Sequence, residues 1–317
     1  MNGFSAPELH YPFAMNSIVT LDNLWMGRPR TIAAALLESE GHRAIIDPGP
    51  GSTLETLHQQ LRTRGIGVAD LDAILLTHIH LDHAGATGAL VRENPRLEVY
   101  VHSKGAPHMI DPSKLLASAA RLWPDELQTL FGETLPVPAE NLRILEGGET
   151  LRLGARKMEV VYTPGHASHH VSYFDNEEGI AFVGDMAGIR IEGQAYVMPA
   201  TPPPDIDLGI WDSSFAAILA RKPSRLFLTH FGISSHPAEH ISLAREQLHR
   251  WAGLAAESIR KEASETAAMD SFISATRAEI AQHLPADELE HYVFSASLNL
   301  SFLGLARYLR KRATAAS

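Results

Sequence analysis

Short apolar runs alternate with turn residues and amphipathic segments over most of the chain up to about residue 235. Two of these runs, "TIAAALLES" and "HRAIIDPG", meet at Glu40-Gly41, a junction that suits a β-hairpin. The segment "STLETLHQQLRTRG" follows, and its Leu54, Leu57 and Leu61 recur at helical spacing. The pattern therefore predicts mixed α and β structure in this part of the chain.

Later apolar runs continue this alternation and then stop. The predicted strands lie in the segments "LDAILLTH", "LEVYVHS", "LRILEGGETLRLG", "RKMEVVYTPGH", "HHVSYFD", "GIAFVGD" and "RLFLTH", and helical patterns occupy residues 83–93 and 113–132. Beyond "HFGISSHP" the chain is almost free of glycine and proline and has apolar residues at helical spacing throughout. We expect a mixed domain over residues 1–236 and an extension of about three helices over residues 237–317, which could serve as substrate cleft, lid or dimer contact.

The amino-acid composition of the chain excludes several kinds of chemistry and several classes of partner. The 317 residues include no cysteine, which excludes disulfides, thiolate metal ligands and a cysteine nucleophile. The formal net charge of −10 and the lack of a basic stripe argue against a nucleic-acid partner. The N-terminal segment lacks the pattern of a secretory signal, and no apolar stretch reaches the roughly 20 residues of a membrane span. We therefore expect a cytoplasmic protein with no membrane association.

Polar residues with metal-binding side chains follow five of the apolar runs. They are Asp47 after "HRAII", His78 and His80 after "DAILL", His166 after "MEVVYTPG", Asp185 after "GIAFVG" and His230 after "RLFLT". In layered α/β folds, the loops beyond one set of strand ends converge on a single site. The sequence thus predicts that these side chains meet at one edge of the fold.

The segment "THIHLDH" at residues 77–83 is the densest part of this pattern. In extended backbone, His78 and His80 point the same way, so both imidazoles can bind one ion. Asp82 and His83 lie where the chain turns into a helix, and their diverging side chains suit a second ion.

Two ions at such a site can share a bridging carboxylate. Asp185 suits that role because it is the remaining carboxylate at a strand end, next to Gly184. Asp47 is then expected to accept a hydrogen bond that orients a ligand histidine.

Taken together and in this order, Asp47, "THIHLDH", "TPGH", "VGD" and "LTH" resemble the motifs of the metallo-β-lactamase-fold hydrolases. Within that superfamily they look most like those of the glyoxalase II-like group. The resemblance covers about residues 15–235. It implies an α+β fold, a four-layer αββα sandwich with the site on the edge shared by its two sheets, followed by the C-terminal helical extension.

The resemblance also implies a ligand set. It assigns three ligands to a first ion (His78, His80 and His166), three to a second (Asp82, His83 and His230), and a bridging role to Asp185. Where the glyoxalase II-like pattern commonly has glycine, this chain has His169, which argues against a glyoxalase II substrate pocket. His170 matches the histidine that follows in the family and is expected behind the ligands.

The expected activity is that of a dinuclear metal-dependent hydrolase, in which a metal-bridged hydroxide attacks an ester, thioester or lactone carbonyl. Asp82 is a candidate proton donor to the leaving group, and Asp47 supports the site. Two divalent ions are expected; zinc suits the His/Asp ligand set, and iron or manganese also fit. The expected partner is a small-molecule substrate.

Several alternatives stay open from the sequence. Persulfide dioxygenases share the "HxHxDH" signature but bind one iron, which here would use His78, His166 and Asp185. The substrate is not specified by any motif, and the apolar helical tail leaves a homodimer open. His102 and His108 could be structural or line the rim of the site.

Overall fold

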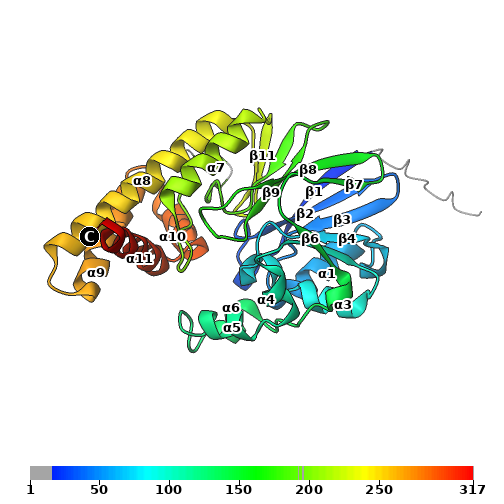
Figure 1. Ribbon diagram of the computed structural model, residues 1–317, viewed down its shortest axis with the longest axis horizontal. Coiled ribbons are helices and arrows are strands. Elements are labelled where there is room, and N and C mark those ends of the chain that lie inside the picture. Colours follow the sequence, from blue (N-terminus) through cyan, green and yellow to red (C-terminus); the bar gives the residue numbers. More distant parts are fainter. Residues whose placement is uncertain (1–15, 192, 195, 317) are drawn as a thin grey trace, which may run out of the picture.

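Two six-stranded β-sheets form the centre of the computed structural model, which describes residues 16–191, 193–194 and 196–316 (Figure 1). The first sheet contains, in spatial order, β1 (Asn16–Asp22), β2 (Ala33–Ser39), β3 (His42–Ile46), β4 (Ala73–Leu75), β5 (Glu98–His102) and β6 (Leu142–Leu145). The second contains β7 (Thr150–Leu153), β8 (Arg156–Tyr162), β9 (Val171–Asp175), β10 (Ile180–Phe182), β11 (Arg225–Leu228) and β12 (Gly232–Ser234). The N-terminal residues 1–15, where the sequence predicts no secretory signal, lie outside the described part.

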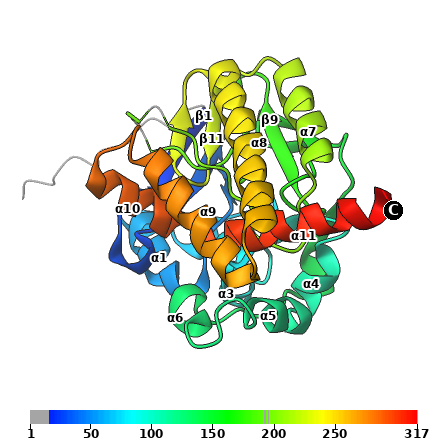
Figure 2. The same cartoon turned by 90° about the vertical axis from the view of Figure 1, so that its left-hand side faces the viewer.

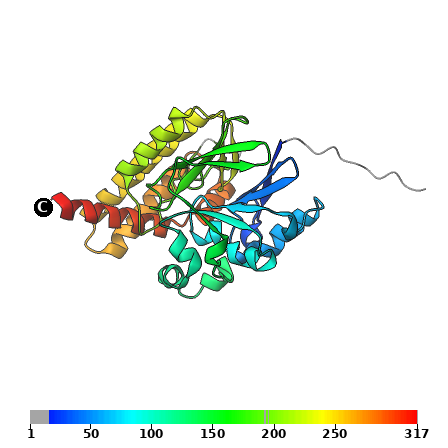
Figure 3. The same ribbon diagram turned by 45° about the vertical axis from the view of Figure 1, so that its right-hand side comes forward.

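Helices cover the outer faces of both sheets (Figure 3). Those of the first half are α1 (Leu54–Arg62), α2 (Leu81–Ala84), α3 (Thr87–Glu93), α4 (Ala106–Ile110), α5 (Ser113–Ala119) and α6 (Leu127–Phe131). In the second half, α7 (Leu208–Ala220) lies between β10 and β11, and α8 (Pro237–Lys261), α9 (Glu265–Ile280), α10 (Ala286–Ser295) and α11 (Leu298–Ala316) follow β12. The predicted αββα sandwich is confirmed.

The alternation of side chains along the strands explains the layering. In β2, Ala33, Ala35 and Leu37 belong to the apolar cluster between the sheets. Ala34 and Leu36 belong instead to the cluster under the helices of the first half. Successive side chains of a strand point to opposite faces, so the unbroken apolar run of β2 is buried on both sides of the sheet.

The hairpin predicted at Glu40-Gly41 is confirmed. Strands β2 and β3 pair in antiparallel register, with Ser39 opposite His42. Both turn residues have positive φ, 50° at Glu40 and 84° at Gly41, as a tight two-residue hairpin turn requires. The sequence pattern did not predict β1, β12 or α7.

The C-terminal segment forms four helices within the described residues, not about three as expected (Figure 2). Pro285 precedes α10, and the residues Ala296 and Ser297 separate α10 from α11. The expected helix count was wrong because a short break without glycine leaves little trace in an apolar pattern.

These helices pack against the second sheet. One apolar cluster includes Leu226 of β11, Trp211 of α7, Trp251 of α8, Phe272 of α9 and Phe302 of α11. Helix α8 begins at Pro237, the first residue of the predicted extension. The division into two domains stays a prediction. No helix in the described ranges is both long and apolar enough to cross a bilayer.

Candidate metal centre

The predicted donors gather beyond the ends of strands from both sheets. Asp47 follows β3, and His78 and His80 follow β4 of the first sheet. His166 follows β8, Asp185 follows β10 and His230 follows β11 of the second sheet. Asp82 and His83 lie in the four-residue helix α2, which begins directly after His80. The structure therefore brings all eight predicted site residues to one place.

Three imidazoles form the first group of donors. Nδ1 of His80 lies 3.0 Å from Nε2 of His78 and 3.0 Å from Nε2 of His166. Together with Asp185, these rings place one donor atom each within 4.8 Å of one another. These three histidines are the set that the family resemblance assigned to the first ion, with Asp185 as the bridge.

Asp82, His83 and His230 form a second group with the same spacing. Oδ2 of Asp82 lies 3.3 Å from Nε2 of His230 and 3.6 Å from Nε2 of His83. The carboxylate of Asp82 is a quarter exposed, whereas the two rings are buried. This group is therefore reached from solvent on the side of Asp82.

Asp185 lies between the two groups. Its Oδ2 is 3.4 Å from Nε2 of His166, and its Oδ1 is 3.1 Å from Nε2 of His83 and 3.5 Å from Nε2 of His230. One oxygen thus faces each group, which is the arrangement of a bridging carboxylate.

Hydrogen bonds behind the rings fix their orientation. Nδ1 of His166 lies 2.9 Å from the Ala200 carbonyl oxygen, and Nδ1 of His230 lies 2.7 Å from the Thr31 carbonyl oxygen. A carbonyl oxygen only accepts, so each Nδ1 carries the proton. When each imidazole is neutral, the lone pair of its Nε2 therefore points into the site, as metal binding requires.

Asp47 supports the site without facing it. Its Oδ1 accepts from the Thr77 amide at 2.8 Å, and its Oδ2 accepts from the hydroxyls of Thr77 at 2.6 Å and Thr229 at 3.1 Å. Its Oδ2 also lies 2.9 Å from Nδ1 of His83. Because the Thr77 hydroxyl donates to Asp47, it accepts from Nδ1 of His78, 3.0 Å away. Asp47 therefore orients His83 directly and His78 through Thr77.

Burial keeps the first group neutral. It lowers the pKa of His78 well below the ordinary value, with smaller contributions from the neighbouring imidazoles. Burial and the ring of His166 lower the pKa of His80 to about 4, and burial also lowers the pKa of His166. Neutral imidazole is the form that binds a metal ion.

In the second group, the nearby carboxylates have the largest net effect on the pKa values of the two histidines. Burial opposes a charge on His83, yet Asp185, Asp82 and Asp47 outweigh it and raise the pKa of His83 well above its ordinary value. In the same way, Asp185 and Asp82 raise the pKa of His230 against the effect of burial. Burial favours the protonated carboxyl of Asp82, but His83 and His230 lower its pKa to about 2. Protons on these two rings thus occupy the place that a cation would take.

The donor set fits a divalent cation. Nε2 of His83 and Oδ1 of Asp185 are buried without a hydrogen-bond partner among the described residues, although they lie 3.1 Å apart. In the metal-free protein the two atoms form an ion pair when His83 is protonated, and a cation between the two groups would satisfy both atoms once that proton has left. Imidazole nitrogens and carboxylate oxygens are ordinary ligands for zinc and for iron.

Two glycines allow the loops to approach this closely. Gly184 has φ of 48°, and a Cβ there would lie 2.5 Å from the Thr77 hydroxyl oxygen and 2.6 Å from Nε2 of His170. Gly165 has φ of 134°, and a Cβ there would lie 2.5 Å from Cα of Trp211. The glycines of "VGD" and "TPGH" therefore position Asp185 and His166.

The other histidines singled out from the sequence have different positions. His170 is buried behind the first group, with its ring stacked on that of His78 at a centroid distance of 5.1 Å. His169 and His108 line the cleft in front of the site. His102 is buried and stacks on Tyr162 at 4.5 Å, outside the donor groups.

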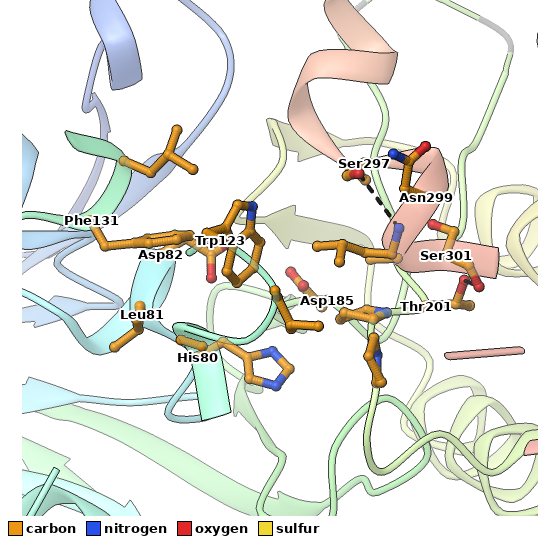
Figure 4. Close-up of a pocket in the computed structure, with 18 of the residues that line it drawn as sticks. His80, Leu81, Asp82, Trp123, Phe131, Asp185, Thr201, Ser297, Asn299 and Ser301 are labelled. Carbon is orange, nitrogen blue, oxygen red and sulfur yellow. Dashed lines mark hydrogen bonds between the residues drawn. The ribbon is translucent and has the colours of Figure 1, made fainter. Parts of the chain in front are cut away.

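The site opens into a cleft of about 730 Å³ (Figure 4). His80, Asp82, Asp185 and His230 line its base. One wall comes from the segment of α5 and α6, and the facing wall comes from the junction of α10 and α11. A cavity of this size accommodates a small organic molecule.

The sequence did not identify the groups that anchor the ligands. Thr77 and Thr229 each precede a predicted ligand in the repeated dipeptide Thr-His, a signal that could have identified them. The carbonyl groups of Thr31 and Ala200 leave no such signal, because a backbone acceptor is independent of residue type.

Comparison with known proteins agrees with this architecture. The family model of the metallo-beta-lactamase superfamily matches residues 27–230. A metallo-beta-lactamase fold-containing protein of Sulfurisphaera tokodaii, ST1585, is 31% identical over 202 residues, which are 61% of this chain and 75% of that protein. Its crystal structure aligns with a TM-score of 0.63 over 92% of this chain and 98% of that chain, at 23% identity.

Two further relatives have informative names. A hydroxyacylglutathione hydrolase of Aeromonas hydrophila is 29% identical over 150 residues, 47% of this chain and only 44% of that enzyme. The crystal structure of TTHA1623 in a di-iron-bound form is 30% identical, with a TM-score of 0.50 over 72% of this chain and 96% of that chain.

Proposed function

The chain belongs to the metallo-beta-lactamase superfamily, and on that premise we propose that it is a dinuclear metal-dependent hydrolase of ester, thioester or lactone bonds. The observation that carries this proposal is the position of Asp185, whose two oxygens face two separate groups of donors. The second group, Asp82, His83 and His230, offers ligands for a second ion. The proposal is therefore a dinuclear hydrolase, and the number of bound ions distinguishes it from the mononuclear iron-dependent dioxygenases that share the same motif.

The residues that would hold the ions are those of the two groups. His78, His80 and His166 would bind one ion, and Asp82, His83 and His230 the other, with Asp185 between them. Divalent ions supply Lewis acidity at such a site, which polarises a carbonyl oxygen and makes water more acidic.

The chain's own residues set up this chemistry in three ways. The carbonyls of Ala200 and Thr31 hold the rings of His166 and His230 with their lone pairs inward. The buried walls exclude water from all sides but the cleft. Asp82 would hold one ion together with His83 and His230, and its role as proton donor to the leaving group stays a prediction.

Metal identity and substrate belong to the same proposal. Zinc suits the mixture of imidazole and carboxylate, and the di-iron form of TTHA1623 supports iron as the alternative. The hydroxyacylglutathione hydrolase relative supports a thioester as one of the candidate bonds. A small-molecule substrate, a cytoplasmic location and a homodimer through the helical tail stay expectations.

A hydrolysis screen with matched elemental analysis tests this function. Purified protein should contain close to two ions per chain and should cleave at least one class among esters, thioesters and lactones. Treatment with a chelator should abolish turnover, and readdition of zinc or iron should restore it. One firmly bound iron per chain, with oxygen uptake in the presence of glutathione persulfide and no hydrolysis, would overturn the proposal.

A further inference from the structure

Two groups of residues line the cleft in front of the metal centre (Figure 4). The first is aromatic and is here called the aromatic pocket; it contains Trp25, Trp123, Phe131 and, from α10, Phe294. The second carries hydroxyl and amide groups and includes Thr201 and, around the start of α11, Ser297, Asn299 and Ser301. The figure shows Trp123 and Phe131 on one side of Asp185 and the polar residues on the other.

The aromatic pocket is assembled from distant parts of the chain. Trp25 lies with its ring centroid 5.9 Å from that of Phe131 and 5.2 Å from that of Phe294. Trp123 meets Phe131 edge to face at 4.9 Å. Such spacing is typical of favourable aromatic pairs. Three segments, near residues 25, 123–131 and 294, therefore converge on one apolar surface.

Polar contacts hold this surface in place. Nε1 of Trp25 donates to the Leu130 carbonyl oxygen at 2.6 Å, and the guanidinium of Arg28 lies 4.0 Å from the ring centroid of Phe294. Leu81, which packs in the same apolar cluster, stands between His80 and Asp82 in the chain. The aromatic pocket is thus pre-formed and continuous with the segment that supplies four predicted ligands.

Apart from the metal centre, the charged side chains that line the cleft do not form a binding site for an ionic substrate. Lys104 donates to the Tyr162 hydroxyl at 2.8 Å, Asp205 accepts from the Ser168 hydroxyl at 2.6 Å, and Arg277 pairs with Glu290. The two other charged residues of the lining, Lys114 and Glu126, have opposite signs. A polyanionic group would find no cluster of cations here.

From these observations we propose that the enzyme selects substrates with an extended apolar group, an alkyl chain or an aryl ring, which the aromatic pocket receives. The inference rests on the proposed hydrolase function and names its substrate class. The scissile carbonyl lies over Asp82 and Asp185, the apolar group against Trp123 and Phe131, and the polar remainder against the α10–α11 junction. A volume of about 730 Å³ leaves room for both parts.

Two series of esters test the proposal. The first lengthens the acyl chain from acetate to decanoate on a constant phenol, and the second lengthens the alcohol of acetate esters, all below micellar concentrations. Each buried methylene should raise kcat/KM by about fourfold until the pocket is full, in whichever series enters the pocket. Hydrolysis that is independent of chain length in both series would overturn the inference and leave the hydrolase function standing.

Amino-acid substitutions test whether the aromatic pocket causes the preference for long apolar groups. Trp123→Ala and the milder Trp123→Leu should both reduce the ratio of decanoate to acetate turnover, Ala by roughly tenfold or more. Ile144→Ala removes an apolar side chain that is half exposed on β6 and should leave this ratio unchanged. The metal content and melting temperature of each variant show whether a lower ratio reflects damage to the pocket alone or loss of the folded structure. An unchanged ratio in well-folded Trp123→Ala protein would contradict the assignment of the pocket.

A measurement of ligand binding distinguishes a failure of this inference from a failure of the proposed hydrolase function. Decanoate should bind the wild-type protein far more tightly than acetate, measured by calorimetry and by quenching of tryptophan fluorescence. Decanoate binding without hydrolysis of any ester would refute the proposed function and support the apolar pocket. Equal binding of acetate and decanoate would refute the pocket whatever the enzyme hydrolyses.

Discussion

Oδ1 of Asp185 lies 3.1 Å from Nε2 of His83, and neither atom has a hydrogen-bond partner among the described residues. The other oxygen of Asp185 faces His166 at 3.4 Å. A carboxylate so placed links the two donor groups, and the predictions below follow from that link.

Removing one imidazole of the first group should remove metal and activity together. His80→Ala deletes the Nδ1 that lies 3.0 Å from both His78 and His166. We expect the loss of at least one ion per chain by elemental analysis and turnover reduced by about a thousandfold or more. His42→Ala, at an exposed histidine of β3, should change neither. Full activity of His80→Ala would refute the ligand assignment.

Asp47 should act through the residues it orients. Asp47→Asn retains the shape of the side chain but places an amide group among the donors from Thr77, Thr229 and His83. Metal affinity should fall by about 10–100-fold, measured by competition with a chromogenic chelator. Asp270→Asn, at an exposed carboxylate of α9, is the matched control. Wild-type affinity in Asp47→Asn would show that Asp47 only closes the turn after β3.

Metal binding should release protons. In the metal-free protein, nearby carboxylates raise the pKa values of His83 and His230, and both rings must lose their protons before they can bind a cation. Apparent metal affinity should therefore rise with pH, and the binding enthalpy should depend on the ionisation enthalpy of the buffer. Affinity that is constant between about pH 6 and 8, with no buffer dependence, would contradict the coupling.

His240 of α8 should make stability pH-dependent. Burial lowers its pKa to about 4, while its Nε2 bonds the Ala187 carbonyl oxygen at 2.8 Å. The unfolded chain binds this proton near pH 6.5 and the folded chain only near pH 4, so stability falls as pH falls through that window and levels off below it.

The effect of His240 is measurable by difference. The full contribution of His240 to the free energy of unfolding is roughly 3 kcal/mol, which follows from the difference between its pKa values in the unfolded and folded chain. His240→Gln retains a donor for Ala187 but does not titrate. Urea unfolding of both proteins between pH 4 and 7 should show a shallower slope for the variant, and identical slopes would exclude His240 as the cause.

The local pattern of the chain was sufficient to predict mixed α and β structure and the gathering of the donors, whereas the sandwich was predicted from the resemblance to the metallo-β-lactamase-fold hydrolases. Strands β2, β3 and β4 contain apolar runs whose alternate side chains are buried on both faces of the sheet, and each polar side chain that follows these runs lies at a sheet end that the fold determines. Strand β12 has three residues, too few for an alternation to be read, and α7 is apolar around most of its circumference, so neither produced a clear period.

The hydrogen bonds that orient the ligand rings and the residues that line the cleft could not be predicted from the sequence, for a different reason. The contacts of His230 with the Thr31 carbonyl and of His166 with the Ala200 carbonyl join residues 199 and 34 positions apart. The aromatic pocket joins Trp25, Phe131 and Phe294 only after the chain has folded. Such pairs carry no local period, and backbone acceptors carry no residue identity.

Anomalous diffraction from crystals of the metal-loaded protein tests the central claim most directly. Maps collected at the absorption edge of the bound metal should show two peaks on opposite sides of Asp185. One should contact His78, His80 and His166, and the other Asp82, His83 and His230. A single peak held by His78, His166 and Asp185, with His83 and His230 bonded only to carboxylates, would contradict the account.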